Sequence, residues 1–355
     1  AWKKRLAGSA QKGEFHAAMK GRLPKNLSKA IIKHKKAIVE GGEKKATRQW
    51  SGAALEVITN LVPEMVGGSA DLSGSNNTLT SATTPMTPKD WTGRYIHYGV
   101  REHGMAAAMN GMSLHGGILP YSGTFLVFAD YSRAAIRLGA LMGTRVVHVM
   151  THDSIGLGED GPTHQPVEHV ASLRAMPNMM VFRPADGVET AECWELALTR
   201  ETGPSTMALT RQGLSPARKD HTQENLCAMG AYVLSPSGVK SRESAVLIAS
   251  GSEVEIALAA QATLAEEKIH VRVVSMPCME LFAQQDAKYQ RDTLGGNLPK
   301  VAVEAGVRFG WDRWIGAEGG FIGMDSFGAS APYTKLYEHF GITSANVAKA
   351  VKGLL

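Results

Sequence analysis

Hydrophobic positions along the chain alternate between two patterns, short continuous apolar runs and longer stretches with apolar residues at helical spacing. From about residue 46, each run is followed by such a stretch; the run 145–150 (RVVHVM) and the run 179–185 (MMVFRPA) are typical. Continuous apolar runs bounded by turns predict buried strands, and the intervening spacing predicts helices. The alternation indicates mostly parallel sheets covered by helices on both faces. The predicted strands are 65–72, 94–99, 118–125, 145–150, 179–185 and 205–213, then 244–251, 270–277, 300–306 and 319–324.

A polar stretch without periodicity separates two such series. Residues 214–228 contain a proline and no repeating apolar spacing, which is typical of a linker. A chain of 355 residues fits two domains. We therefore predict two doubly wound α/β domains, at 46–215 and 228–355, preceded by a basic helical connection at 1–45.

The charge pattern bears on possible partners. Eleven Lys and Arg residues lie between Lys3 and Lys36, and they alternate with apolar residues such as Ile31 at helical spacing. A solvated helix face explains them better than a nucleic-acid site, because no aromatic residues are interleaved for base stacking. No run approaches the roughly 18 apolar residues of a membrane span. Three widely spaced cysteines suggest no disulfide framework, so we expect a cytoplasmic protein that binds neither nucleic acid nor membrane.

The loop 151–166 (THDSIGLGEDGPTHQP) contains a GxGxxG pattern at Gly156, Gly158 and Gly161. A dinucleotide site needs these glycines directly after a strand and at the start of a helix. Here three polar residues precede them, two carboxylates lie among them and prolines follow, so a nicotinamide oxidoreductase is disfavoured. The loop instead presents its polar side chains at the carboxyl end of a strand, where they either bind a hydroxylated ligand or only cap turns. The residues themselves leave both possibilities open; the polar side chains are His152, Asp160 and His164.

Histidines are concentrated in the first predicted domain. Seven of the twelve lie there, but no HExxH or other short ligand pair occurs, and His164 and His169 are poorly spaced for one helical face. We therefore expect no metal ligands in this chain. The seven are His97, His103, His115, His148, His152, His164 and His169.

Several motifs resemble the transketolase family in order and spacing. Glu102 lies at a predicted strand-to-helix junction in IHYGVREHGMAAAMNG, and Phe125, Phe128 and Tyr131 follow three apart, as if on one helical face. Taken alone, that stripe is more typical of core packing. The resemblance covers essentially the whole chain and includes 68–77 (GGSADLSGSN), 151–174 (THDSIGLGEDGPTHQPVEHVASLR), 209–213 (LTRQG), 249–258 (ASGSEVEIAL) and 272–277 (RVVSMP).

The resemblance implies a thiamine diphosphate enzyme. It implies that Glu102 hydrogen-bonds a ring nitrogen of the cofactor's aminopyrimidine. This bond helps the aminopyrimidine to act as the general base that activates the cofactor. Phe125, Phe128 and Tyr131 would form the pocket for that ring, and Asp71 would support the cofactor site near a dimer interface. The fold implied is a pyrimidine-binding domain followed by a transketolase C-terminal domain.

The resemblance also implies the reaction and its substrates. Members transfer a two-carbon ketol unit from a ketose phosphate to an aldose phosphate, in the pentose phosphate pathway or the Calvin cycle. Asp160 would hold a donor hydroxyl, and His164 would bond the sugar near the reacting carbonyl. The sugar phosphate would be held by Arg48, Ser75, His152 and Arg211, because guanidinium groups match phosphate oxygens.

The chain departs from the family pattern in one respect. Family members carry an N-terminal domain with a GDG motif that binds the diphosphate and Mg²⁺ or Ca²⁺, and this chain has no GDG; the nearest stretch is 185–192 (ADGVETAE). We therefore expect half of an active site completed at a homodimer interface, inactive without the other domain. The alternatives are a related thiamine enzyme (dihydroxyacetone synthase, deoxyxylulose-phosphate synthase or a ketoacid dehydrogenase beta subunit) and a noncatalytic transketolase-like module.

Overall fold

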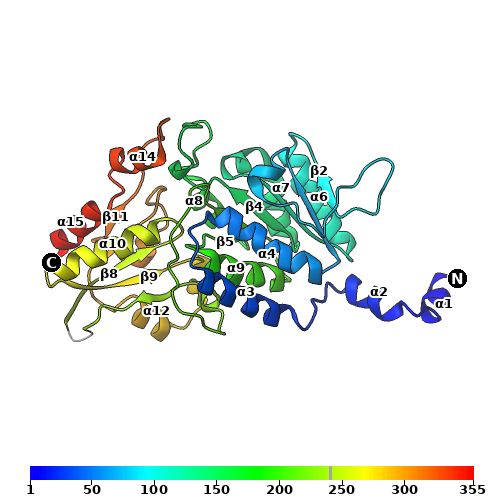
Figure 1. Ribbon diagram of the computed structural model, residues 1–355, viewed down its shortest axis with the longest axis horizontal. Helices are drawn as coiled ribbons and strands as arrows, with labels where there is room; N and C mark the ends of the chain where they lie inside the picture. Colours follow the sequence, from blue (N-terminus) through cyan, green and yellow to red (C-terminus); the bar gives the residue numbers. More distant parts are fainter. Residues whose placement is uncertain (240–241) are drawn as a thin grey trace.

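The first half of the chain forms a six-stranded parallel sheet in the order β2-β1-β3-β4-β6-β5. The computed structural model describes residues 1–239 and 242–355 (Figure 1). All five residues of β1, β4 and β6 are buried, because both faces of the sheet are covered. The strands are β1 (Met65–Ser69), β2 (Tyr95–His97), β3 (Leu119–Phe125), β4 (Val147–Thr151), β5 (Met180–Phe182) and β6 (Ser205–Leu209).

Helices cover this sheet in two layers. One apolar cluster joins one sheet face to α3 (Leu27–Gly41), α4 (Thr47–Leu61) and α9 (Gly187–Thr199). A second cluster joins the opposite face to α6 (Glu102–His115), α7 (Ala129–Met142) and α8 (His169–Arg174). The predicted doubly wound architecture is therefore confirmed. Shorter elements are α5 (Ser73–Asn76) and the 3-10 turns η1 (Leu126–Phe128), η2 (Ile155–Leu157) and η3 (Leu226–Met229).

The second half forms a five-stranded mixed sheet in the order β11-β10-β8-β9-β7. Its edge strand β7 runs antiparallel to β9 and was not predicted, because only the first of its four residues is buried. The strands are β7 (Tyr232–Ser235), β8 (Glu243–Ala249), β9 (His270–Ser275), β10 (Lys300–Val303) and β11 (Gly320–Ile322). The helices are α10 (Glu253–Glu266), α11 (Met279–Ala283), α12 (Ala287–Thr293), α13 (Asp312–Ile315), α14 (Tyr333–His339) and α15 (Ser344–Leu354).

The basic N-terminal segment is only partly a solvated face. Helices α1 (Trp2–Ala7) and α2 (Lys12–Met19) bury no residue and extend from the body of the molecule (Figure 1). In α3, however, Lys35 is 1% exposed, and its ammonium lies 2.7 Å from the Glu192 carboxylate of α9. The prediction that all these lysines are solvated is therefore wrong for Lys35, which forms a buried ion pair.

The two halves are joined by buried ion pairs at the carboxyl ends of their strands. Arg183, which follows β5, donates to Asp153 Oδ2 at 2.9 Å and also pairs with Glu253 at the start of α10. Arg174 of α8 binds Glu304, which follows β10, through two bonds of 2.8 and 2.9 Å. Removing one partner of such a pair strongly destabilises the folded protein, because the other partner would remain charged and buried. They fix the second half against the loop that follows β4.

The segment between the halves is not a loose linker. Asp186, which caps the start of α9, accepts hydrogen bonds from the backbone N–H groups of Ala217 and Arg218. Arg218 and Cys227 are buried. The polar composition of 214–228 correctly indicated a segment without strands, but polar contacts hold that segment against α9.

Among the residues that the structure describes, no helix has both the length and the apolar character that a membrane span requires.

Candidate active site

Two predicted phosphate-binding arginines lie side by side at the carboxyl edge of the first sheet. Arg48 is the second residue of α4, and Arg211 lies just after β6. Burial is the main cause that lowers the pKa of Arg48, and the positive charge of Arg211 lowers it further. Arg48 Nη1 donates to the backbone carbonyl of Ser75 at 2.7 Å, while Arg48 Nε has no hydrogen-bond partner. Neither arginine pairs with a carboxylate among the described residues. The pair therefore forms an uncompensated cationic site suited to an anion.

His152 adjoins these arginines as a neutral side chain. Burial is the largest cause that lowers the pKa of His152, and the positive charges of Arg48 and Arg211 lower it further, to about 3. Its Nδ1 lies 2.9 Å from Thr151 Oγ1, which accepts a hydrogen bond from Asn76 Nδ2 at 2.8 Å. Because that hydroxyl already accepts from Asn76, its hydrogen is available to donate to Nδ1. The arrangement favours the tautomer with N–H on Nε2, a neutral donor for a ligand.

The predicted aromatic residues form one cluster with the two loop histidines. Phe125 stacks on His152 with ring centroids 3.7 Å apart, and Phe128 lies 5.8 Å from Phe125 in a nearly parallel orientation. The His164 ring lies 5.5 Å from Phe128. Tyr131 continues the series 5.8 Å from Phe128. The structure thus brings together five of the predicted site residues.

The geometry of this cluster differs from the predicted helical stripe. Phe125 is the last residue of β3, Phe128 lies in η1 and only Tyr131 lies in helix α7. The stacking of Phe125 on His152 follows from the sheet, because Phe125 pairs in register with Thr151 at the end of the adjacent strand β4. The aromatic surface is therefore built by strand ends and not by one helix face.

Glu102 is the first residue of α6 and is 7% exposed. Its carboxylate has no hydrogen-bond or ion-pair partner in the described part of the chain, and its oxygens are not among the polar atoms that are wholly shielded from solvent. Asp71 follows β1 with φ of +65° and is exposed. Glu102 is therefore available to a ligand, while Asp71 marks a tight turn at the same edge of the sheet.

The glycine loop is held by the second half of the chain. Gln165 Nε2 donates to the carbonyls of Gly158 and Ala329, both at 2.9 Å, and Ser330 Oγ donates to the carbonyl of Glu159 at 2.6 Å. Asp160 remains exposed at the tip. Gln165 and Ser330 were not predicted as part of the site, because no local pattern signals a contact between segments so far apart in the chain.

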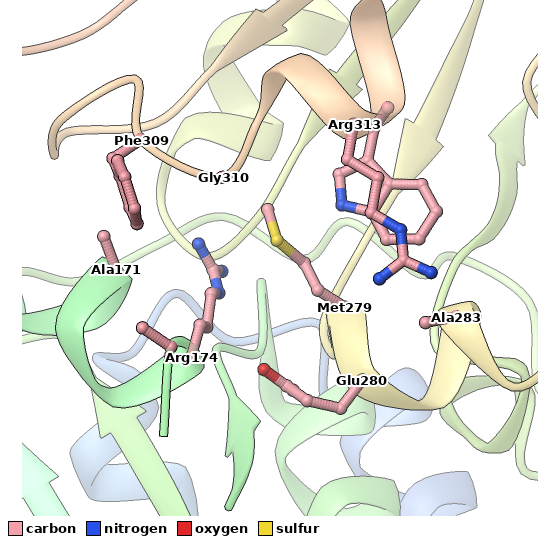
Figure 2. A pocket seen from close by; sticks show the side chains of 10 residues that line it. Ala171, Arg174, Met279, Glu280, Ala283, Phe309, Gly310 and Arg313 are labelled. Carbon is pink, nitrogen blue, oxygen red and sulfur yellow. The ribbon is translucent and has the colours of Figure 1, made fainter. Parts of the chain in front are cut away.

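A cavity of about 230 Å³ lies elsewhere, between α8 and the helices α11 and α13 (Figure 2). It is lined by Arg174, Met279, Glu280, Phe309 and Arg313 among others. It shares no residue with the cluster of arginines, histidines and aromatic rings. The predicted site is thus an open edge of the sheet and not this cavity.

Two family models match this chain. The family model described as "Transketolase, pyrimidine binding domain" matches residues 43–216, and that described as "Transketolase-like TK C-terminal domain" matches residues 230–343. The chain belongs to the transketolase family. The transketolase of Sinorhizobium medicae is 54% identical over all of this chain and 51% of its own length.

Solved transketolases share the fold. The Pichia stipitis transketolase in complex with sedoheptulose-7-phosphate has a TM-score of 0.91 at 36% identity, covering 99% of this chain and 52% of that one. A structure described as "Split gene transketolase, inactive beta4 tetramer" has a TM-score of 0.73 at 26% identity, covering 88% of this chain and 98% of that one. This chain therefore spans about half the length of the curated transketolases it matches and is similar in extent to a split transketolase subunit.

Proposed function

We propose that this chain provides the aminopyrimidine-binding and sugar-binding half of a transketolase active site. In the proposed reaction a two-carbon ketol unit passes from a ketose phosphate to an aldose phosphate, as in the pentose phosphate pathway of the cytoplasm. Residues 46–215 serve as the pyrimidine-binding domain and 228–355 as the transketolase C-terminal domain. The observation that carries the proposal is the unpartnered carboxylate of Glu102, a residue only 7% exposed, in a chain that also clusters Phe125, Phe128 and Tyr131.

These residues fit the cofactor that the family uses. A flat heterocycle can stack on the rings of Phe125 and Phe128, whose nearly parallel planes offer an apolar face. The Glu102 carboxylate, held at the start of α6, can accept a hydrogen bond from a ring nitrogen and so hold a proton there. Thiamine diphosphate, when bound, supplies the nucleophilic carbon that breaks and forms the carbon–carbon bond.

The cationic edge fits the substrate's phosphate. Arg48 and Arg211 supply charge-assisted donors and His152 supplies a neutral one, while Ser75 lies on the same edge with its carbonyl fixed by Arg48. Asp160 and His164, on the loop facing the aromatic cluster, can bond sugar hydroxyls and the reacting carbonyl. The Pichia stipitis complex with a seven-carbon sugar phosphate supports this substrate class.

The diphosphate and its Mg²⁺ or Ca²⁺ require residues beyond those on this edge. The one stretch that resembles a GDG motif, around Asp186, is a helix cap: Asp186 Oδ1 accepts from the backbone N–H of Glu189, and Oδ2 is bonded to the 217–218 backbone. The matched transketolases are about twice as long as this chain, which supports a second polypeptide region that binds these groups. The split-gene transketolase tetramer, whose chain has a similar extent, is described as inactive. This supports the proposal that the present chain is inactive by itself.

A homodimer with the site at its interface is part of the proposal. Large apolar side chains are exposed on and beside α6 and α7, a concentration that often marks an association surface. They are Val100, Leu114, Tyr131, Leu138, Leu141 and Met142.

Complementation tests the proposed function. The chain is mixed with the remaining half of the Sinorhizobium medicae transketolase, and ketol transfer is assayed with ketose phosphate, aldose phosphate, thiamine diphosphate and Mg²⁺. We expect turnover in the mixture, none with either part alone, and turnover lower by about 10²-fold or more when Glu102→Gln is used. Cofactor binding without turnover in a stable complex would instead indicate a noncatalytic module, and robust turnover by residues 1–355 alone would overturn the half-site proposal.

A further inference from the structure

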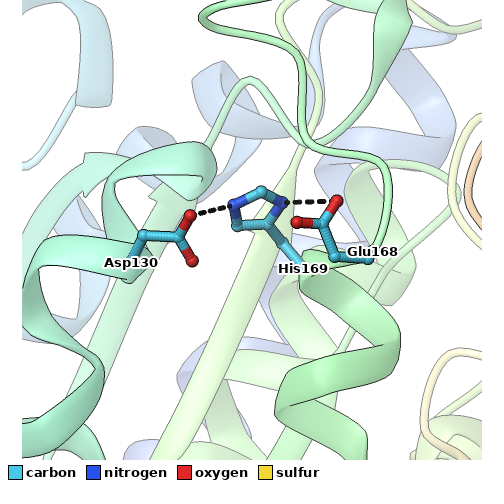
Figure 3. Close-up of side chains that lie close together, drawn as sticks. All are labelled: Asp130, Glu168 and His169. Carbon is cyan, nitrogen blue, oxygen red and sulfur yellow. Dashed lines mark ion pairs between the residues drawn. The ribbon is translucent and has the colours of Figure 1, made fainter. Parts of the chain in front are cut away.

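Three potential metal-binding side chains converge between α7 and α8, outside the site described above (Figure 3). Asp130 lies in the first turn of α7, and Glu168 and His169 lie at the start of α8. One ligand atom from each residue lies within 4.8 Å of the others. Figure 3 shows the imidazole ring between the two carboxylates.

The His169 ring is buried without hydrogen bonds. The residue is 5% exposed, and neither ring nitrogen has a hydrogen-bond partner. Nε2 nevertheless lies 3.2 Å from Asp130 Oδ2, and Nδ1 lies 3.8 Å from Glu168 Oε2. A buried imidazole donor left unsatisfied costs about 1–3 kcal/mol, so its environment requires an explanation. Two ligands of one ion also lie at contact distance without a hydrogen bond between them, as Nε2 and Asp130 Oδ2 do here.

The spacing fits a tetrahedral cation. Zinc binds imidazole nitrogen and carboxylate oxygen at about 2.0–2.2 Å, so two such ligands lie about 3.3 Å apart. The 3.2 Å separation of His169 Nε2 and Asp130 Oδ2 matches that edge. The Glu168 carboxylate contacts the other ring nitrogen, Nδ1, so it must swing around the ring to become a third ligand; its ligand atom lies within 4.8 Å of the others. Water can complete the shell. One nitrogen with two carboxylate oxygens suits a divalent first-row transition metal.

The helices that carry these ligands are braced independently of any ion. Arg133, one turn after Asp130 on α7, donates through Nη1 to Ser172 Oγ of α8 at 2.9 Å. Ser172 Oγ in turn donates to the His169 carbonyl at 3.0 Å. The nearby arginine is therefore bonded to Ser172, and the ligand-bearing turns are held in place before a cation arrives.

We propose that Asp130, Glu168 and His169 bind one divalent transition-metal cation, with Zn²⁺ as the best match. The ion fastens the start of α7 to the start of α8, next to the segments that carry Tyr131 and His164. This inference does not depend on the proposed function, and it replaces the expectation that the chain contains no metal ligands.

Metal titration of the full chain tests the site. Metal-free protein is titrated with Co²⁺ by visible absorption and with Zn²⁺ by calorimetry. We expect one Co²⁺ per chain with the absorption of a tetrahedral complex, and at least about tenfold weaker binding in both His169→Asn and Asp130→Asn. Because Asp130 is exposed, its variant reports on the site without disturbing a core side chain. The matched control His115→Asn, at an exposed histidine outside the cluster, keeps wild-type binding.

Two outcomes would overturn the proposal. One is the absence of tetrahedral Co²⁺ absorption, which would leave His169 as an ion-pair bridge between carboxylates. The other is metal binding of equal affinity in the two ligand variants and the wild type, which would place the ion elsewhere.

Discussion

Thr47 and Thr210 exchange hydrogen bonds between their backbones and side chains. The Thr47 N–H donates to Thr210 Oγ1 at 3.0 Å, and the Thr210 N–H donates to Thr47 Oγ1 at 2.8 Å. Both residues are fully buried. Because Arg48 and Arg211 are the next residues along the chain, this exchange holds together the two backbone segments that carry them.

Replacing Thr47 by Val removes one of these two hydrogen bonds, the one to Thr47 Oγ1, while preserving the shape of the side chain. The Thr210 N–H loses its acceptor, so we expect a loss of about 1–3 kcal/mol in the free energy of unfolding, measured by urea denaturation. In the complemented enzyme, KM should rise more for phosphorylated than for unphosphorylated sugars. The control Thr263→Val, on the exposed face of α10, should change neither quantity; equal KM changes for both sugar types would refute the positioning role.

Arg211→Ala removes one half of the cationic pair. Charge-assisted hydrogen bonds contribute about 1.5–3 kcal/mol, so we expect KM for phosphorylated substrates to rise roughly 10- to 100-fold, with a smaller effect on unphosphorylated ketoses. Steady-state kinetics of the complemented enzyme measures both. Arg291→Ala, on α12 of the second half, is the matched control. A uniform effect on both substrate types would contradict a phosphate-binding role.

Glu304 makes stability depend on pH in the acid range. Burial acts to raise the pKa of Glu304, but Arg174 and Arg183 outweigh it and lower the pKa from 4.5 to about 2. A depressed folded-state pKa stabilises the protein above pH 4.5, and this stabilisation is lost as the pH falls from 4.5 toward 2. The shift corresponds to about 3 kcal/mol.

Glu304→Gln tests that pH dependence. The variant should be less stable than the wild type at pH 7, because it removes the charged partner of Arg174, and the difference should narrow between pH 4.5 and 2. Denaturant unfolding at several pH values gives the two curves. Parallel curves across this range would show that Glu304 does not titrate as described.

Glu102→Gln retains the size of the side chain but cannot hold the proton. In the complemented enzyme we expect turnover to fall by about 10²-fold or more, the range for a lost acid–base group, while folding is unaffected. Glu64→Gln, just before β1, is the control. Near-normal turnover in Glu102→Gln would remove Glu102 from the mechanism.

The strands were predictable because burial on both faces of a parallel sheet favours a continuous apolar run, as in the last five residues of β8. The strand β7 was not, because three of its four residues are partly or fully exposed. The burial of Lys35 was equally hidden, since its partner Glu192 lies on a helix distant in the sequence. Patterns report local periodicity, while ion pairs depend on tertiary contacts.

The candidate site was predictable only in part. Its residue identities came from the resemblance to transketolases, and in the structure Phe125, Phe128, Tyr131, His152 and His164 lie in one cluster. The cluster of Asp130 and His169 could not be found by looking for short ligand pairs, because its members come from different helices. Gln165 likewise gains its role only through the second half of the chain.

The most direct test of the central claim is an experimental structure of the complemented assembly with thiamine diphosphate and Mg²⁺ bound. We predict that the aminopyrimidine ring lies against the aromatic cluster with a ring nitrogen within about 3 Å of a Glu102 carboxylate oxygen. A cofactor bound with its pyrimidine away from Glu102, or a Glu102 carboxylate turned toward solvent, would contradict the account.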